Sequence, residues 1–344
     1  MAHRSFSHPL TVIFCVFFAA LLAACAGLNK TPTPTSTPAA TAIPPTPTAA
    51  PAELIWVDAQ PVANDSLVTT LTGFASANSL QYRTLTTLAS TDITSGTKIV
   101  VFRSAPADLS SLASAAAATQ FILLGSSNPA GLNNVSSIQA KPADEAFMAG
   151  YLAMLISQDW RAAALVTNDG PIGSAYADDF ANGGKFVCGK CNPFYSPIVA
   201  FPTTLSEPAA SSSSTWTADA ATLSKNWLSS VFISPSAVSA DVATALNSQN
   251  INSTLNGDSV YLISTADAPQ NDGIQWTALL SADYNAGLKE LLPQVLAGKG
   301  NLTAAAQITL TSLNEDVVTP GKQTLFNQVA TDLAADKIIP STVQ

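Results

Sequence analysis

The chain has 344 residues, of which 47% are hydrophobic and only 11% are charged, and its formal net charge is −9. Such a chain can bury a large core, in two ordinary domains or one bilobal unit, and must cover its surface mainly with uncharged polar side chains. The acidic balance argues against a nucleic-acid partner, whose binding rests on neutralising phosphates, and against a peripheral patch for anionic lipid.

The amino terminus is typical of an exported protein. An apolar run from Leu10 to Leu22 is too short to span a bilayer of about 30 Å comfortably, but it suits a signal peptide. The run closes with Leu22-Ala23-Ala24-Cys25, which resembles the bacterial lipobox, where the cysteine is lipidated and the signal is cut just before it. We therefore expect a lipoprotein signal peptide over 1–24 and lipidation of Cys25. An ordinary signal peptide and an uncleaved anchor are the alternatives.

A tether follows this cysteine. Residues 31–52 consist mainly of Pro, Thr and Ala, without charge and with almost nothing to bury, so they stay extended and solvated. At about 3.1 Å per residue in polyproline II geometry, they reach on the order of 70 Å. We predict a disordered tether over 25–52 that holds a folded domain, 53–344, on the extracytoplasmic face of the cell membrane.

Histidine and cysteine usage restricts the chemistry of the mature chain. His3 and His8 both precede the expected cleavage point, so the mature chain would contain no histidine. This excludes Ser-His-Asp and Cys-His catalysis and zinc sites that use imidazole. Carboxylate pairs or Ser-Lys arrangements remain, but no spacing singles one out. We expect no enzymatic activity, no cofactor and no metal site.

The two cysteines left after Cys15 and Cys25 are Cys188 and Cys191, in the sequence FVCGKC. A zinc knuckle would need two further ligands, and a thioredoxin-like pair would begin a helix after a strand. In an exported setting a local disulfide between Cys188 and Cys191 is favoured. Reduced thiols and redox catalysis are the alternatives.

Strand and helix patterns alternate through the folded domain. Predicted strands are Leu54–Val57, Tyr82–Leu85, Lys98–Phe102, Phe121–Leu124, Ser136–Ala140, Ala162–Thr167, Ile198–Phe201, Val231–Ile233, Tyr261–Ile263 and Gln275–Leu280. Helical patterns cover 107–118, 143–157, 171–182, 217–228, 239–249 and 284–297. Short apolar strands with helical connections indicate parallel sheets covered on both faces. There are too many units for one small sheet, so we expect an α/β fold with two doubly wound lobes, in which ligands lie beyond the carboxyl ends of the strands.

The segment after Pro142 predicts an amphipathic helix. Proline suits a first helical position, Asp144 and Glu145 suit the positive first turn, and Gly150 allows close approach of another backbone. A packing role is sufficient to explain this pattern.

Several strings resemble the basic membrane protein family, also called purine nucleoside receptor A-like. They are DEAFMAGYLAMLIS, AAALVTNDGPIGSAYADDFANGGKFVCGKCNPFYSPI, IQWTALLSADYNAGLKELL and a tail ending NEDVVTPGKQTLFNQVATDLAADKIIP. Glu145, Gly150, Ala153, the stretch 180–184 and the CGKC turn carry the match. It covers most of 140–344 and is weaker over 53–139.

The resemblance implies a substrate-binding lipoprotein of an ABC importer with a type I periplasmic-binding fold. Two Rossmann-like lobes with three crossovers would close on a small-molecule ligand, and an ABC permease would be the partner. The expected first lobe spans about 53–140 plus a segment near 274–300. The second lobe spans about 141–270 plus the C-terminal region.

The resemblance leaves the ligand open. Nucleoside-binding members have an Asp-x-Ser-Phe-Asn-like motif whose ring stacks on the base, and the matching stretch here is Asn64-Asp65-Ser66-Leu67-Val68. The carboxylate and hydroxyl are kept, whereas the ring and the amide are not. The family's ribose-binding Gly-Val-Asp motif aligns loosely with 264–266, and Asp267 falls just beyond. A nucleoside and another small polar ligand are therefore alternatives.

Polar residues that follow strand ends are the candidates for the cleft. They are Asp58, Asp65, Ser66, Arg103, Ser104, Asn128, Asn168, Asp169 and Asp267, each of which could instead cap a helix or face water. The guanidinium of Arg103 could fork onto a carboxylate or phosphate. Trp216 and Tyr195 could supply aromatic walls, although core packing is favoured for both.

A solute receptor for an ABC permease is thus the favoured function. A sensing or interaction lipoprotein that uses the same cleft without transport is the alternative. In either case binding would act by closing the lobes around a hinge.

Overall fold

A computed structural model describes residues 50–61, 65–248, 259–269 and 273–342. The expected signal peptide, Cys25, Asn64 and most of the tether lie outside these residues. In the part of the chain that is described, no helix is long and apolar enough to cross a membrane.

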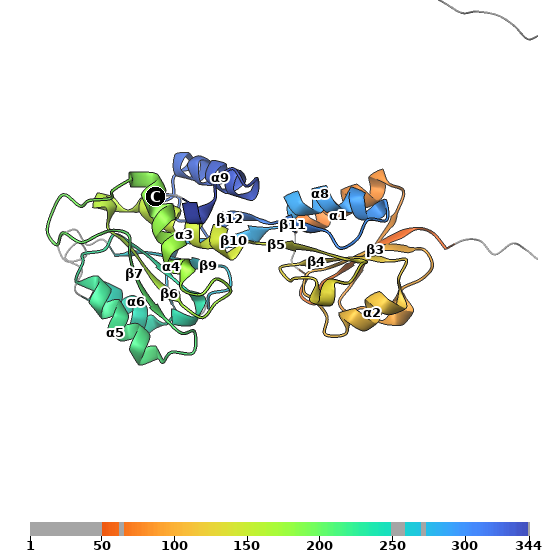
Figure 1. The fold of residues 1–344 in the computed structure, drawn as a ribbon, viewed down its shortest axis with the longest axis horizontal. Helices are drawn as coiled ribbons and strands as arrows, with labels where there is room; N and C mark the ends of the chain where they lie inside the picture. The colour runs from red at the N-terminus through yellow and green to blue at the C-terminus, as the bar shows by residue number, and fades with distance from the viewer. Residues whose placement is uncertain (1–49, 62–64, 249–258, 270–272, 343–344) are drawn as a thin grey trace, which may run out of the picture. The chain divides into compact units, whose positions relative to one another are not determined.

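The first lobe is built on a six-stranded parallel sheet in the order β2-β1-β3-β4-β5-β11. Its strands are β1 (Glu53–Val57), β2 (Gln81–Leu85), β3 (Thr97–Phe102), β4 (Gln120–Leu124), β5 (Val135–Gln139) and β11 (Thr303–Ala305). Helices α1 (Ser66–Ala77) and α8 (Asn285–Leu296) cover one face, and α2 (Leu109–Ala115) covers the other (Figure 1). Every residue of β1 is buried, as expected for a strand covered on both sides.

The second lobe repeats this plan with the order β7-β6-β8-β9-β10-β12. Its strands are β6 (Ala162–Thr167), β7 (Thr203–Glu207), β8 (Ser230–Ile233), β9 (Tyr261–Thr265), β10 (Trp276–Asp283) and β12 (Gln307–Thr311), of which β12 is antiparallel to β10. Helices α3 (Pro142–Ile156), α4 (Ala175–Cys188) and α9 (Pro320–Ala334) lie over one face, and α5 (Ser213–Ser224) and α6 (Ala240–Asn247) over the other (Figure 1).

The chain passes between the two sheets three times, after β5, after β10 and after β11. The predicted α/β fold with two Rossmann-like lobes and three crossovers is therefore confirmed. The segment that returns to the first lobe differs from the expected 274–300. Strand β10 pairs with β9 and β12 in the second sheet, so the returning segment begins at α8 and runs through β11.

Helices α3 and α4 pack backbone to backbone because both have glycine at the contact. A Cβ atom on Gly150 would lie 1.9 Å from the carbonyl oxygen of Phe180, and one on Gly183 would lie 1.9 Å from that of Phe147. No larger residue fits at either position without moving a helix. The predicted close approach at Gly150 is thus observed, and Gly183 is its partner across the contact.

The predicted strand at Ile198–Phe201 is wrong, and the edge strand β7 lies just after it. The flanking Pro197 and Pro202 lack the N–H that a strand ladder needs. The buried guanidinium of Arg161 also takes the carbonyl oxygens of Tyr195 and Pro197 as hydrogen-bond acceptors. This segment is consequently a loop, and its start is joined to α4 by a disulfide between Cys188 and Cys191.

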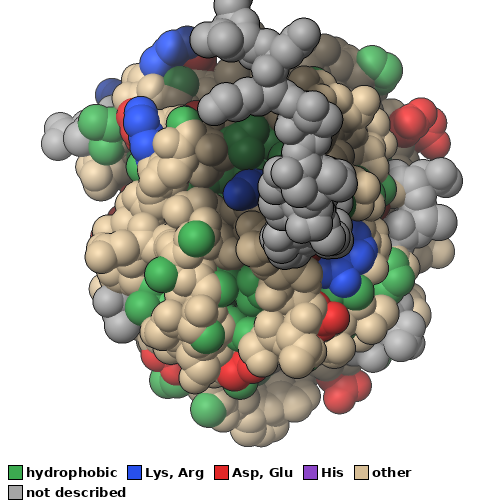
Figure 2. Space-filling model, turned by 90° about the vertical axis from the view of Figure 1, so that its right-hand side faces the viewer, with side chains coloured by type: hydrophobic (Ala, Val, Ile, Leu, Met, Phe, Trp, Pro, Cys, Tyr) green, Lys and Arg blue, Asp and Glu red, His purple; other side chains and the backbone are tan. Residues whose placement is uncertain are grey.

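Charged side chains are sparse on the face shown in Figure 2, where most visible atoms belong to the backbone or to side chains that are neither charged nor apolar. This agrees with the 11% charged residues of the sequence.

Candidate functional site

A cavity of about 600 Å³ lies where the carboxyl ends of the two sheets meet. The first lobe contributes Asp65, Ser66, Arg103 and Gly125, from the segments that follow β1, β3 and β4. The second lobe contributes Thr265 and Asp267 at the end of β9 and Asp283 at the end of β10, and the crossover that follows contributes Tyr284. This is the place where doubly wound folds bind ligands.

A second cavity of about 470 Å³ adjoins the first, and Ala140 and Glu145 line both. Its other lining residues come mainly from the second lobe and include Thr167, Asp169, Tyr176 and Ser234. Glu145 lies in the first turn of α3, and it stands at the junction of the two cavities. Together they form one continuous cleft, which we call the interlobe cleft.

Arg103 is held by two carboxylates on the first-lobe side. Its Nε donates to Oδ2 of Asp58 at 2.7 Å, and one terminal nitrogen donates to Oδ2 of Asp65. The guanidinium carbon also lies 5.2 Å from the centre of the Trp56 ring. The side chain of Asp58 is only 2% exposed, whereas that of Arg103 is 30% exposed. The guanidinium therefore stabilises a buried aspartate and closes the wall of the cavity.

Asp65 has a second role at the start of α1. Its Oδ1 accepts a hydrogen bond from the backbone N–H of Leu67 at 2.9 Å, which is the usual arrangement of a helix N-cap. Both oxygens of Asp65 therefore have partners within the protein.

Glu145 faces Tyr176 and Asp267 in the cleft. The Tyr176 hydroxyl donates to Oε1 of Glu145 at 3.3 Å. Burial raises the pKa of Glu145, the hydrogen bond from Tyr176 lowers it, and the charge of Asp267 raises it. Burial, followed by the charge of Asp267, likewise raises the pKa of Tyr284, which Arg103 lowers. Asp267 thus acts on two groups that line the first cavity, Glu145 and Tyr284, and no described residue donates a hydrogen bond to its carboxylate.

The crossover from β10 to α8 forms the floor of the first cavity. Oδ1 of Asp283 accepts from the backbone N–H and the side-chain amide of Asn285, at 2.9 and 2.7 Å. Asn285 also donates to Ser66 Oγ at 2.9 Å and accepts from Thr70 Oγ1 at 2.7 Å. These bonds hold the chain on both sides of Tyr284, which lies between Asp283 and Asn285 and lines the cavity.

The structure brings together only some of the predicted cleft residues. Asp65, Ser66, Arg103 and Asp267 line the first cavity, and Asp169 lines the second. Asp58 lies behind Arg103, and Ser104 is an exposed neighbour that lines neither cavity.

Asn128, Asn168, Trp216 and Tyr195 also lie outside the lining of both cavities. Asn128 holds its own loop, donating to the carbonyl oxygens of Leu132 and Val135 at 2.9 Å. Asn168 donates to the carbonyl oxygen of Ser206. Trp216 is 1% exposed in the core of the second lobe, as favoured, whereas Tyr195 is 72% exposed and belongs to no core.

Sequence reasoning missed Glu145, Asp283 and Tyr284 as cleft residues, and it included Thr265 only in the stretch 264–266 that the resemblance relates to ribose binding. Asp283 and Tyr284 escaped because the predicted strand ended at Leu280, three residues before the observed end of β10. The rule that selected the other candidates, polar residues after strand ends, would otherwise have found them. Glu145 also follows a strand, β5, but a carboxylate in the first turn of a helix is favourable by itself. The sequence therefore offered no reason to place Glu145 in a binding site.

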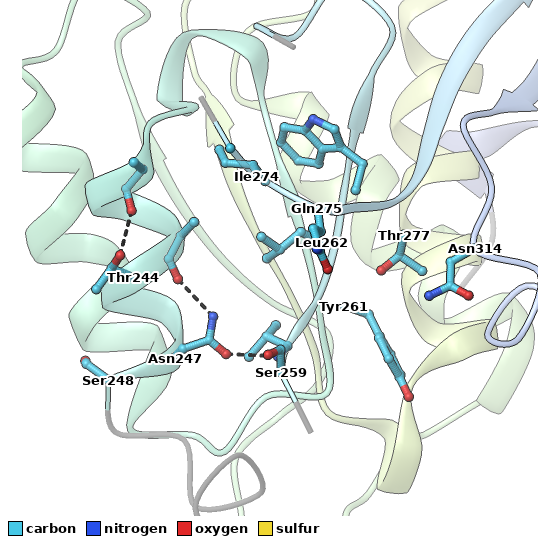
Figure 3. A pocket seen from close by; sticks show the side chains of 15 residues that line it. Thr244, Asn247, Ser248, Ser259, Tyr261, Leu262, Ile274, Gln275, Thr277 and Asn314 are labelled. Atoms are coloured by element: carbon cyan, nitrogen blue, oxygen red, sulfur yellow. Dashed lines mark hydrogen bonds between the residues drawn. The ribbon is translucent and has the colours of Figure 1, made fainter. Parts of the chain in front are cut away.

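A larger hollow of about 1090 Å³ lies elsewhere, between α6 and the starts of β9 and β10 (Figure 3). Thr244 and Asn247 come from the helix, while Tyr261, Gln275 and Asn314 lie across from it. It is at the amino ends of these strands, opposite to the end where ligands bind in such sheets. Its lining residues Ser248, Ser259 and Gly273 border, in the sequence, the segments 249–258 and 270–272, which lie outside the described residues, and we place no site there.

Among the described residues, no three His, Cys, Asp or Glu side chains are grouped so that they could hold a metal ion. The candidate site is therefore a polar cleft of carboxylates, hydroxyls and two tyrosine rings.

Neither a protein-family model nor a curated protein sequence matches the chain. Solved structures do. An ABC transporter solute-binding protein from Conexibacter woesei aligns with a TM-score of 0.53 at 15% identity, over 84% of this chain and 98% of that one. An arabinose-binding protein from Geobacillus stearothermophilus (TM-score 0.47, 15% identity, 78% and 98% covered) and a sugar-binding protein from Bacillus halodurans (0.47, 13%, 77% and 97%) are also similar. The first of these matches shows that the chain shares its two-lobed fold with a solute-binding protein.

Proposed function

We propose that this chain is the solute-binding lipoprotein of an ABC importer and binds a small polar ligand in the interlobe cleft. The observation that carries this proposal is the cavity of about 600 Å³, lined by polar side chains from both lobes at the carboxyl ends of their sheets. The fold shared with a solute-binding protein supports it. So does the resemblance of most of 140–344 to the basic membrane protein family.

The arrangement suits capture and release rather than covalent chemistry. The aliphatic hydroxyls that line the first cavity are those of Ser66, Thr265, Ser281 and Thr309, and no histidine or lysine is among its described lining residues. A ligand that contacts both lobes favours the closed arrangement, because only that arrangement satisfies both sets of contacts. Closure would then present the two lobes to a permease, the proposed partner.

A nucleoside is the ligand that the family resemblance suggests, with another small polar solute as the alternative. Asp65, Ser66 and Asp267, which the resemblance relates to base and ribose binding, line the same cavity. Leu67 stands where the family has its stacking ring, but Tyr284 offers a ring from the crossover. Stacking of this kind contributes about 1–3 kcal/mol per base in single-strand binders.

The membrane anchor rests on the sequence of the amino terminus. We propose that lipid on Cys25 and the tether over 25–52 hold the domain on the extracytoplasmic face. Cys25→Ser should move the protein from the membrane to the soluble fraction, with Cys15→Ser as the control that stays on the membrane. Equal membrane association of the Cys25→Ser protein would contradict the anchor.

The binding function is tested by native mass spectrometry of protein released gently from its own cells. A bound small molecule, lost in unfolding and restoring the melting temperature when added back, is the expected result. In vesicles that contain the permease, the loaded protein should also stimulate ATP hydrolysis. Ligand binding without this stimulation would favour the sensing lipoprotein, and absence of any ligand would count against both.

A further inference from the structure

The interlobe cleft holds far more negative than positive charge. Four carboxylates line the first cavity, those of Asp65, Glu145, Asp267 and Asp283, and Asp169 is added by the second. Arg103 is the single cation among the residues that line either cavity, and Asp58 and Asp65 already pair with it. Lys141 lies next to the lining residues Ala140 and Pro142, but its ammonium group pairs with Asp336.

Asp267 is the carboxylate most available to a ligand. It is exposed to the cleft, and no described residue forms a hydrogen bond or ion pair with it. Thr265, two residues before it, is only 6% exposed and its hydroxyl has no partner in the protein. A carboxylate that only water can meet and a buried hydroxyl without a partner thus lie at the end of β9, among the residues that line the cavity.

Closing the lobes would remove water from these carboxylates. A buried charge without a partner of opposite sign is costly, so a neutral or anionic ligand would leave the closed cleft with uncompensated negative charge. A ligand that brings positive charge would compensate it. The rings of Tyr284 and Tyr176 line the same cleft, and aromatic rings together with carboxylates are a recurring setting for ammonium groups.

Resting on the proposed binding function, we propose that the solute is a small organic cation that carries one or more ammonium groups. Asp267 would receive the ammonium group, with Asp283 and the ring of Tyr284 beside it. Arg103, which is paired with Asp58 and Asp65, would form part of the cavity wall and would not bind an anion.

The probes for the test are putrescine, spermidine and choline, compared with adenosine, galactose and inorganic phosphate. Calorimetric titration of the purified, ligand-stripped domain should show binding of at least one of the three amines. Binding should weaken by about tenfold or more between roughly 0.05 and 0.5 M salt, as expected when exposed charges are screened. Adenosine, galactose and phosphate should bind at least about tenfold more weakly, the ratio that one lost charge contact supplies.

Two variants locate the site. Asp267→Asn, at an exposed position, should weaken amine binding by about tenfold or more without changing the melting temperature of the free protein. Glu315→Gln removes one negative charge from the exposed loop beyond the far end of β12, and should leave binding unchanged.

The outcomes separate the ligand class from the binding function. Binding of adenosine, galactose or phosphate in preference to all three amines overturns the ligand class but keeps the proposed function. Amine binding that Asp267→Asn and Glu315→Gln reduce equally also overturns it, because the effect is then one of net charge. Binding of none of the six probes overturns the ligand class, and it counts against the function as well if native mass spectrometry finds no solute.

Discussion

The guanidinium of Arg103 shows how the role of one residue depends on its neighbours. The chain has only 14 Lys and Arg in all, so an arginine beside a predicted cleft is a natural candidate for binding an anion. In the structure, the carboxylates of Asp58 and Asp65 accept hydrogen bonds from two different nitrogens of its guanidinium group. The residue closes the wall of the cleft and keeps a buried carboxylate satisfied.

Arg103→Met should therefore destabilise the domain by about 1–3 kcal/mol, the usual cost of leaving a buried polar group without its partner. Urea unfolding measures the change. Lys289→Met, at an exposed position of α8, is the control and should stay within about 0.5 kcal/mol of the parent. The double change Arg103→Met with Asp58→Asn should recover part of the loss. If Arg103→Met alone is as stable as the control, the ion pair with Arg103 does not stabilise the buried carboxylate of Asp58.

Asp144 gives the domain a pH-dependent stability. Burial is the main cause that raises its pKa to about 6, and Lys141 lowers it while Asp336 and Asp179 raise it. A carboxyl whose pKa is higher in the folded state holds its proton more tightly there than in the unfolded chain. Its contribution to stability is therefore fully present below its unfolded value of 3.8 and is lost as the pH rises through about 6.

Asp144→Asn should raise the free energy of unfolding at pH 7 and flatten its fall between about pH 4 and pH 6. Urea titrations across this range measure it. Asp241→Asn, at an exposed position of α6, should keep the slope of the parent protein. An unchanged slope in Asp144→Asn would show that other groups cause it.

At the scale of elements, the contact between α3 and α4 is set by two glycines rather than by the apolar pattern of either helix. Gly150→Ala would press a methyl group against the carbonyl of Phe180, and forced overpacking costs about 1–3 kcal/mol or more. Gly73, in α1, has no atom within 4 Å of where a Cβ would lie. Gly73→Ala should instead stabilise the domain by about 0.5–1 kcal/mol, because glycine is a poor helix former.

Thermal and urea unfolding of the two alanine variants should therefore move in opposite directions. The comparison separates packing from helix propensity, since the same chemical change is made in both. Equal shifts of the two variants would mean that the helices can separate at little cost.

At the scale of the whole molecule, Asn285 ties the crossover after β10 to the first lobe through Ser66 and Thr70. Strand β10 itself belongs to the second sheet, so this amide is a mechanical link between the lobes. Its three hydrogen-bond partners are Asp283 at the end of β10 and Ser66 and Thr70 of α1.

Asn285→Ala should speed amide hydrogen exchange over 283–288 by about fivefold or more, the effect of losing about 1 kcal/mol of local stability. Exchange followed by mass spectrometry measures it. Gln294→Ala, which loses only a bond to the carbonyl of Glu290 in its own helix, is the control. If protection of 283–288 does not change, the link does not hold the crossover.

Much of the fold could be predicted from the sequence because its parallel strands are buried on both faces and appear as unbroken apolar runs, as in β3 and β4. The edge strand β7 was missed because its five residues, TTLSE, are all partly exposed or exposed. The strand predicted at Ile198–Phe201 is wrong because its apolar composition does not reveal that Arg161 donates hydrogen bonds to the preceding backbone carbonyls.

The sequence by itself determined the α/β class, the two lobes and which strand ends could face a ligand, because periodicity and the direction of parallel strands are local properties. Only the tertiary structure decided that Arg103 is already paired, that Asn128 and Asn168 hold their own loops, and that Glu145, Asp267 and Asp283 share one cleft. These facts depend on residues far apart in the chain. The net charge of a site depends on all the charged groups that folding brings together. It cannot be read from any single segment of the sequence.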